Sequence, residues 1–276
     1  MQRNGIPYIL GFCVAICLAC AVVVSTSAVG LKEQQELNKE LDRKSKVLAV
    51  AGLITEGQAT PDEIQDQFAK RIKPIVVNLE SGAINEELTK NAATFDQHKE
   101  AKDPELGKNA PKNPAGIKRI PSNATVYLVS SKEMDGEGNG FELQQYIFPV
   151  EGKGLWSTLY GFFAVAPDFN EVKGLTFYAH LETPGLGGEV DNPDWKALWK
   201  GRRVFGPDGS KIGDWEGVKL SVIKGKAGSA ADDPYQVDGL SGATITSKGV
   251  TYLIEFWMGE NGFGNYIKNT LGGAAS

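Results

Sequence analysis

The chain has 276 residues, 41% of them hydrophobic and 23% charged, and its formal net charge is −5 at pH 7. This length is enough for one large domain or two small ones, and the acidic balance argues against nucleic acid as a partner. All three cysteines lie before residue 21, so no disulfide is predicted for the rest of the chain.

An uncharged and mostly apolar stretch runs from Ile6 to Val29. As a helix its length of about 24 residues would span roughly 36 Å, which is enough to cross a lipid bilayer. The apolar region of a cleaved signal peptide is shorter, about 7–15 residues. We therefore predict a short tail over residues 1–5 and a single transmembrane helix over residues 6–29.

The cysteines of this helix, Cys13, Cys17 and Cys20, share one stripe. They could pack against partner helices or bind a metal, but the simpler interpretation is small apolar side chains in lipid. Charge does not settle the orientation of the helix. Lysines and arginines concentrate after it, which by itself would place the following domain in the cytoplasm, yet long domains cross membranes largely regardless of charge.

Residues 30–121 are predicted to form a helical and irregular membrane-proximal segment that packs on the following domain. Within it, Leu31–Leu53 has the apolar spacing of a helix that continues out of the membrane. Gly52 is a plausible stop signal for this helix.

A second, shorter helix is predicted to start at Thr60-Pro61, where a capping residue precedes a proline in the first turn. We expect it to end before Pro74. From Ser81 to Pro121 the composition is polar and prolines recur, which predicts an irregular covering segment rather than a second domain.

Strand signals dominate the part of the chain after residue 121. Four segments are rich in aromatic and β-branched residues and are separated by turn residues: Ala124–Val129, Phe141–Phe148, Leu159–Val165 and Leu175–His180. A later strand is expected at Val218–Ile223. Strands mixed with a few helices in no regular alternation predict an α+β domain over residues 122–276, with an antiparallel or mixed sheet.

A turn of small residues lies near the end of this domain: Asp238-Gly239-Leu240-Ser241-Gly242-Ala243-Thr244-Ile245-Thr246-Ser247. It leads into a helix whose expected buried face carries Val250, Leu253, Ile254 and Trp257. We expect Thr246 or Ser247 to be the N-cap. Free N–H groups at a helix start, with glycines that allow close approach, favour a phosphate; a capped helix after a loop is the simpler alternative.

A second glycine-rich stretch, Glu182-Thr183-Pro184-Gly185-Leu186-Gly187-Gly188-Glu189, follows directly on a predicted strand. Its Pro-Gly pair and further glycines predict a tight loop whose backbone can approach a flat ring closely. If Glu182 were ionised and faced such a ring, it would oppose negative charge there.

Two tryptophans and two histidines are weaker candidates for a functional role. Trp195 and Trp199 have the spacing of one helical face, which favours core packing over stacking on a cofactor. The only histidines, His98 and His180, have no cysteine or acidic neighbours at metal-ligand spacing, so the sequence predicts no metal site. His180, just before the glycine-rich loop, is the better functional candidate of the two, although a satisfied polar side chain is the simpler interpretation.

The small-residue turn resembles the flavinylation motif of proteins that carry FMN in phosphoester linkage to threonine. The whole chain resembles the C subunit of the sodium-pumping NADH:quinone oxidoreductase, most weakly over residues 81–121. The segments that carry this resemblance are the N-terminal anchor, Tyr178-Ala179-His180, the glycine-rich loop, the tryptophan pair, Tyr235-Gln236-Val237 and Phe256–Gly264. The homologous G subunit of Rnf-type ferredoxin:NAD oxidoreductases has the same motif but is typically shorter, which favours the sodium pump.

The resemblance implies specific site residues. It places the phosphoester of FMN on Thr244 and not on Thr246, and it makes Asp238, Ser241, Gly242 and Ala243 parts of the motif. Since no histidine lies near this segment to activate a threonine hydroxyl, a separate flavin transferase is expected to attach the cofactor. The resemblance also implies that one loop packs against the isoalloxazine ring, and we call it the flavin loop: Glu182, Thr183, Pro184, Gly185, Leu186 and Gly187.

The resemblance further implies a membrane-anchored subunit of a Na⁺-transporting NADH:ubiquinone reductase, with no substrate chemistry and no catalytic residue of its own. Its covalent FMN would relay electrons toward quinone in a complex with five other subunits, named with the letters A, B, D, E and F. The soluble domain would face the periplasm of a bacterial inner membrane, where the transferase acts. The alternatives are the Rnf-type subunit, a membrane-tethered flavoprotein that relays electrons or acts as a sensor in another system, or a surface module without a redox role.

Overall fold

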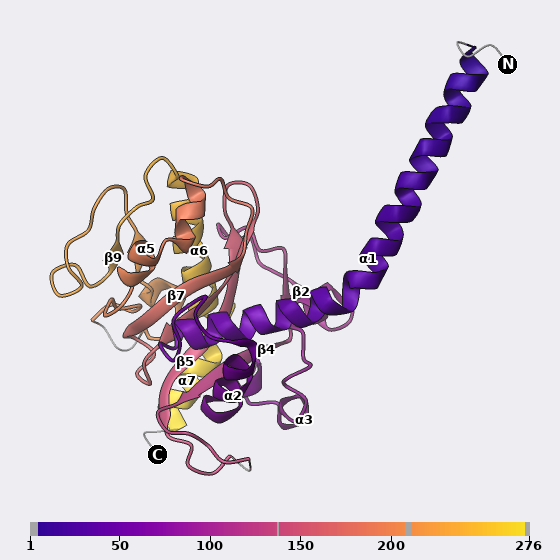
Figure 1. Ribbon diagram of the computed structural model, residues 1–276. Helices are drawn as coiled ribbons and strands as arrows, with labels where there is room; N and C mark the ends of the chain where they lie inside the picture. Colours follow the sequence, from indigo (N-terminus) through magenta and orange to yellow (C-terminus); the bar gives the residue numbers. More distant parts are fainter. Residues whose placement is uncertain (1–4, 137, 208–210, 274–276) are drawn as a thin grey trace. The chain divides into compact units, whose positions relative to one another are not determined.

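The computed structural model describes residues 5–136, 138–207 and 211–273 (Figure 1). The chain divides into two compact units, residues 1–43 and residues 44–276. Helix α1 (Ile6–Val50) supplies the first unit, where its apolar side chains are exposed along their length. By its length and composition this helix could cross a membrane. It ends two residues before Gly52, whose φ of 75° is the left-handed value typical of a helix stop.

Helix α2 (Pro61–Arg71) begins as the sequence predicts. The Thr60 side chain accepts a hydrogen bond from the Glu63 N–H, and the Glu63 carboxylate accepts one from the Thr60 N–H at 2.8 Å. This reciprocal pair is a capping box, which satisfies two N–H groups that the helix start would otherwise leave free.

The sequence does not predict the strand that follows, β1 (Ile72–Asn78), because it contains Pro74. β1 lies at the edge of the sheet, where a proline is tolerated. Its other outward N–H groups are occupied: Ile72 donates to the Phe68 carbonyl, Val76 to Thr89 Oγ1 at 2.9 Å, and Asn78 to the Ala83 carbonyl at 2.8 Å.

The central sheet has five antiparallel strands in the order β1-β4-β5-β6-β7, which confirms the α+β class. The four strands after β1 match the predicted ones: β4 (Asn123–Ser130), β5 (Leu143–Lys153), β6 (Thr158–Val165) and β7 (Val172–Ala179). β5 runs on beyond its predicted end at Phe148, and β7 begins before its predicted start at Leu175. The long β5 brings Lys153 and Gly154 to the end of the sheet where the candidate site lies.

The polar segment before β4 contains only short elements: α3 (Glu86–Thr89), α4 (Gln97–Lys102), β2 (Gly107–Asn109) and β3 (Arg119–Pro121). Its buried polar side chains hydrogen-bond to residues at the start of β4. The Glu100 carboxylate accepts hydrogen bonds from the N–H and the side-chain amide of Asn123, at 2.8 and 2.9 Å. The segment is therefore irregular, as predicted, but bound closely to the sheet.

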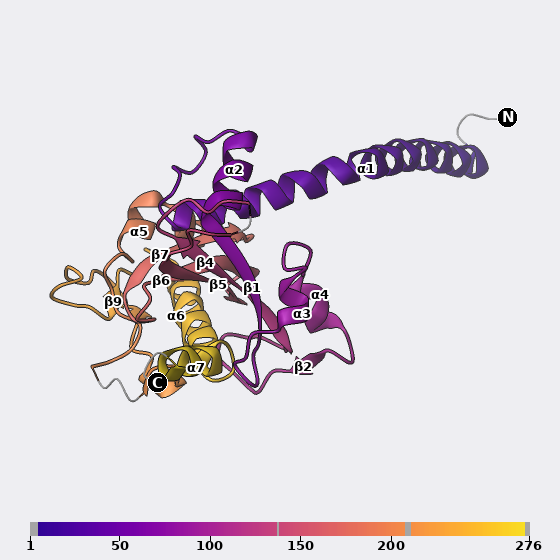
Figure 2. The same cartoon turned by 90° about the horizontal axis from the view of Figure 1, so that it is seen from below.

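Helices cover both faces of the sheet. Figure 2 shows α6 (Thr244–Met258) and α7 (Gly264–Gly273) on one face, with α2 on the other. Residues Val47 and Leu48, at the C-terminal end of α1, are also buried in the second unit.

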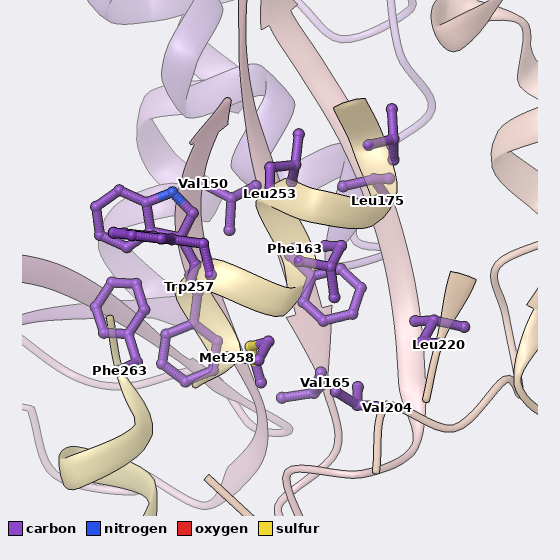
Figure 3. Packing of buried hydrophobic residues seen from close by; sticks show 14 of the residues in the cluster. Val150, Phe163, Val165, Leu175, Val204, Leu220, Leu253, Trp257, Met258 and Phe263 are labelled. Atoms are coloured by element: carbon purple, nitrogen blue, oxygen red, sulfur yellow. The ribbon is translucent and has the colours of Figure 1, made fainter. Parts of the chain in front are cut away.

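The α6 face of the sheet holds the main hydrophobic core. Figure 3 shows Leu253 and Trp257 of α6 packed with Val150 and Phe163 of the sheet. The predicted buried face of this helix is confirmed, because Val250, Leu253, Ile254 and Trp257 are all at most 1% exposed. Burial of each such side chain contributes about 1.5–3 kcal/mol, so α6 is fixed firmly on the sheet.

The remaining elements connect β7 to α6: η1 (Gly187–Asp191), α5 (Pro193–Ala197), η3 (Trp215–Gly217), β8 (Ser221–Val222) and β9 (Gln236–Val237). The strand predicted at Val218–Ile223 is reduced to β8, which pairs in parallel with β9. Trp195 and Trp199 are buried and meet edge to face at 5.5 Å between ring centroids, which confirms their predicted core role.

Candidate functional site

The small-residue turn ends where α6 begins, at Thr244. The predicted N-caps are wrong, because Thr246 and Ser247 lie inside the first turn of the helix. Ala243 holds the cap position, and within the described part of the chain no side chain accepts the first N–H groups. The Ser247 hydroxyl instead accepts a hydrogen bond from the Leu240 N–H at 3.0 Å and closes the turn. An uncapped helix start combines free N–H groups with the positive end of the helix dipole, and both favour an anion.

The two threonines of this first turn have opposite environments. Thr244 is exposed to solvent. Thr246 is 0% exposed, and its hydroxyl donates to Glu182 Oε2 at 2.6 Å. A second enzyme could therefore reach the hydroxyl of Thr244 but not that of Thr246.

A groove of about 430 Å³ lies beside Thr244. Three lysines from two sides of the groove line it: Lys224, Lys226 and Lys248. Among the described residues, no hydrogen bond or ion pair engages their ammonium groups. Lysine is a common phosphate ligand because its ammonium group is a compact charge with three donors. The groove therefore combines positive charge with an uncapped helix start.

Asp238 and Gly239 shape this groove. Asp238 Oδ1 accepts a hydrogen bond from the Ala227 N–H at 2.9 Å, and its carbonyl accepts one from Trp195 Nε1 at 2.8 Å. A Cβ on Gly239 would lie 2.2 Å from the Ile223 carbonyl oxygen, so only glycine fits there. Asp238 thus has a structural role within the turn.

The flavin loop reaches the turn through Glu182, whose side chain is 5% exposed. Its carboxylate accepts hydrogen bonds from three consecutive backbone N–H groups, those of Leu155 (3.2 Å), Trp156 (2.9 Å) and Ser157 (3.2 Å), in addition to the Thr246 hydroxyl. One carboxylate therefore joins the flavin loop, the turn before β6 and the first turn of α6. The two stretches that the sequence singles out are brought together.

Glu182 is ionised at neutral pH. Burial would raise the pKa of its carboxyl group, but the hydrogen bonds from Thr246 and from the N–H groups of Trp156, Ser157 and Leu155 outweigh burial and hold the pKa below its ordinary value. The negative charge is turned toward these donors, which stabilise it.

The tip of the flavin loop lies close to the small-residue turn. Gly185 has a φ of 74°, which favours glycine, and Thr183 to Leu186 are exposed. A Cβ on Gly242 would lie 2.9 Å from Leu186 Cδ2, and a Cβ on Gly187 would lie 2.7 Å from Thr246 Oγ1. These glycines permit the loop and the turn to touch.

His180 fixes the start of the flavin loop. Its Nε2 lies 2.8 Å from Asp191 Oδ2, and its Nδ1 accepts a hydrogen bond from the Glu182 N–H at 3.2 Å. Both ring nitrogens have partners, which confirms the interpretation of a satisfied polar side chain.

Sequence reasoning missed the three lysines of the groove and gave the turn at residues 155–157 no role in the site. The glycine-rich stretch Gly152-Lys153-Gly154-Leu155-Trp156 is a weak signal for this turn, because such runs are common in loops. In the structure a Cβ on Gly154 would lie 2.6 Å from Glu182 Oε1. No local pattern marks the lysines, since residues 222–226 and residues 238–248 must meet before the lysines face one groove.

Comparison with known proteins identifies the family of the chain. Residues 154–259 match the family described as FMN-binding domain, a range that includes the flavin loop and the turn. The C subunit of the Na⁺-translocating NADH-quinone reductase of Yersinia pestis is 41% identical over 263 residues, 95% of this chain and 91% of the relative. The corresponding protein of Pseudomonas aeruginosa is 43% identical over 263 residues, 94% of each chain.

The chain belongs to this family of C subunits. The fold agrees: the crystal structure of NqrC from Shewanella oneidensis matches with a TM-score of 0.72 at 35% identity, over 85% of this chain and 99% of that one. The C subunit from Parabacteroides distasonis matches with a TM-score of 0.59 at 27% identity, over 87% and 96%. As a member of this family with an FMN-binding domain, the chain is a flavin-binding, membrane-anchored subunit of an NADH-quinone reductase complex.

Proposed function

We propose that the chain carries FMN in phosphoester linkage to Thr244 and serves as an electron carrier in a Na⁺-exporting NADH:ubiquinone reductase. The observation that carries the proposal is the contrast between the exposed Thr244 hydroxyl, beside an uncapped helix start, and the buried, hydrogen-bonded Thr246. When bound, FMN would supply the redox chemistry by which the subunit passes electrons toward quinone.

The residues around Thr244 fit a phosphate ester. The first N–H groups of α6 have no side-chain acceptor among the residues that the structure describes, and Lys224, Lys226 and Lys248 bring positive charge to the adjacent groove. A phosphodiester carries less charge than the phosphate monoester of free FMN, which eases its placement against a partly buried turn. Ser241, Gly242 and Ala243 would leave room for it through their small side chains.

The flavin loop would provide the surface for the isoalloxazine ring. Thr183, Pro184, Gly185 and Leu186 are exposed at its tip, and Leu186 touches the turn at Gly242. Glu182 and Gly187 would support the loop from its buried side rather than touch the ring. Both are buried, and the Glu182 charge points to the N–H groups of residues 155–157.

A separate flavin transferase would form the bond. A threonine hydroxyl needs a base to become a nucleophile. In the described part of the chain no side chain hydrogen-bonds to the Thr244 hydroxyl, and the nearer histidine in sequence, His180, is occupied by Asp191 and the Glu182 N–H. The base is therefore assigned to the transferase.

We also propose the arrangement of the chain at the membrane: a tail over residues 1–5, a transmembrane helix over residues 6–29, a membrane-proximal segment over residues 30–121 and an FMN-binding domain over residues 122–276 in the periplasm. Strand β1 of the membrane-proximal segment completes the sheet of the domain. Alkaline phosphatase fused to the C-terminus is expected to be active in intact cells, because the enzyme matures only outside the cytoplasm. Fluorescence from a cytoplasm-restricted reporter at the same position would contradict this orientation.

The place of the protein in a larger complex is tested by purification from native membranes in mild detergent. We expect five partner proteins, the A, B, D, E and F subunits, to copurify with the chain, and yellow flavin to stay on the polypeptide after denaturation. Recovery of the flavin-bearing chain with a different set of partners would instead support a relay in another system. A colourless chain of unmodified mass would contradict the proposed function.

A further inference from the structure

A second cavity, of about 550 Å³, lies apart from the groove beside Thr244 and shares no lining residue with it. Its walls come from α4, from the loop over residues 115–119, from the end of β5 and from the start of β6. This volume falls within the range of small-molecule sites, about 300–1,000 Å³.

The cavity is positively charged although the chain as a whole is acidic. Lys102, Lys118 and Lys153 line it, and within residues 5–136, 138–207 and 211–273 no hydrogen bond or ion pair engages their ammonium groups. Lysines elsewhere on the surface, such as Lys70 and Lys132, are paired with carboxylates. Three unpaired lysines around one hollow create a local field that attracts anions.

The other charged groups of the cavity are already occupied. Glu151 Oε2 lies 3.0 Å from His98 Nδ1. The Arg119 guanidinium donates to the carbonyl oxygens of Ala101, Asp103 and Gly107, at 2.5, 2.6 and 2.8 Å. Among the described residues Glu151 forms no ion pair with the three lysines, and Arg119 acts as a brace for the cavity wall.

The walls are fixed before any ligand enters. The Asn113 amide donates to the carbonyls of Pro111 (2.7 Å) and Ile117 (2.8 Å) and accepts from the Ile117 N–H at 3.1 Å. On the opposite side His98 Nε2 lies 3.2 Å from the Tyr178 hydroxyl, and its ring meets Tyr160 edge to face at 5.2 Å. A preformed site loses less entropy on binding than a flexible one.

The exposed side chain of Trp156 lines the cavity. Trp156 is 70% exposed, although indole rings are normally well covered. Its backbone N–H is held by Glu182, so the ring projects from a fixed turn. Such a ring offers a flat face for a planar group.

We propose that this cavity binds a phosphate ester, with the phosphate among Lys102, Lys118 and Lys153 and a planar group against Trp156. It would be a second anion site of the chain, and it does not depend on the presence of FMN at Thr244. Both a soluble nucleotide-sized ligand and a lipid headgroup offer the phosphate.

The test uses the full-length, flavin-bearing protein in phosphatidylcholine nanodiscs and adenosine 5′-monophosphate (AMP) as the probe, with calorimetry as the readout. We expect AMP to bind, and the double variant Lys118→Gln/Lys153→Gln to bind it about tenfold more weakly. The double variant Lys90→Gln/Lys112→Gln removes two exposed lysines outside the cavity and should bind like the wild type. Trp156→Ala should weaken AMP binding about tenfold but leave binding of inorganic phosphate unchanged.

The source of the phosphate is read from nanodiscs that contain phosphatidylglycerol. If AMP binds equally in both kinds of nanodisc, the ligand is soluble. If phosphatidylglycerol competes with AMP in the wild type but not in Lys118→Gln/Lys153→Gln, the ligand is a lipid headgroup. Absence of AMP binding in phosphatidylcholine nanodiscs, or wild-type affinity in the folded Lys118→Gln/Lys153→Gln variant, would overturn the proposal.

Discussion

Replacing Thr244 with alanine is expected to leave the protein without covalently bound flavin. Thr244 presents the exposed hydroxyl of the first turn of α6, where the helix start and three lysines favour a phosphate. The variant loses only an exposed side chain, so the fold should persist. The measurement is flavin fluorescence of the denatured polypeptide, together with the mass of the peptide that contains residue 244, after coexpression with a flavin transferase.

Thr246→Val is the matched control for this experiment. It removes a hydroxyl from the same helical turn but keeps the shape of the side chain. Flavin attachment should remain, while loss of the 2.6 Å hydrogen bond to Glu182 should lower the free energy of unfolding by about 1–3 kcal/mol. Flavin on a Thr244→Ala chain, or its loss from a folded Thr246→Val chain, would refute the assignment of the linkage.

Glu182→Ala is expected to lower the free energy of unfolding by about 3 kcal/mol or more, because three backbone N–H groups and one hydroxyl lose their acceptor in a buried place. Thermal or denaturant unfolding of the detergent-solubilised protein measures the loss. Glu182→Gln keeps one carbonyl oxygen as an acceptor and should lose less. A Glu182→Ala variant as stable as the wild type would show that the carboxylate does not hold the three segments together.

The same carboxylate gives the stability a defined pH dependence. Its pKa is lower in the folded than in the unfolded chain, so its stabilising contribution is fully present above the unfolded value of about 4.3 and is lost as the pH falls through the folded pKa. The stability difference between the wild type and Glu182→Gln should therefore shrink from pH 6 toward pH 3. A difference that stays constant over this range would mean that folding does not lower the pKa of Glu182.

Local patterns predicted most of the fold. Alternation and aromatic content located β4 to β7, and helical spacing located the buried face of α6. Strand β1 was not predicted, because proline usually interrupts a strand. Pro74 is tolerated only because β1 lies at the edge of the sheet. Whether residues 72–78 form a strand is therefore decided by the tertiary arrangement and not by the residues of β1 themselves.

The candidate site was predictable as two separate segments but not as one assembly. Glycines and small residues marked the flavin loop and the turn correctly as places of close backbone approach. The N-cap prediction failed because Thr246 satisfies its hydroxyl with Glu182, which is 64 residues away, rather than with its own helix. A capping preference of about 1 kcal/mol cannot compete with a hydrogen bond to a buried charge.

The edge strand β1 bears on how the protein behaves before it finds its partners. A sheet edge with free donors can recruit the edge of a second copy and start aggregation. Here Pro74 has no N–H to offer, and the donors of Ile72, Val76 and Asn78 are already taken by Phe68, Thr89 and Ala83. Strand exchange through this edge of the sheet is therefore disfavoured, which keeps newly made copies available for assembly.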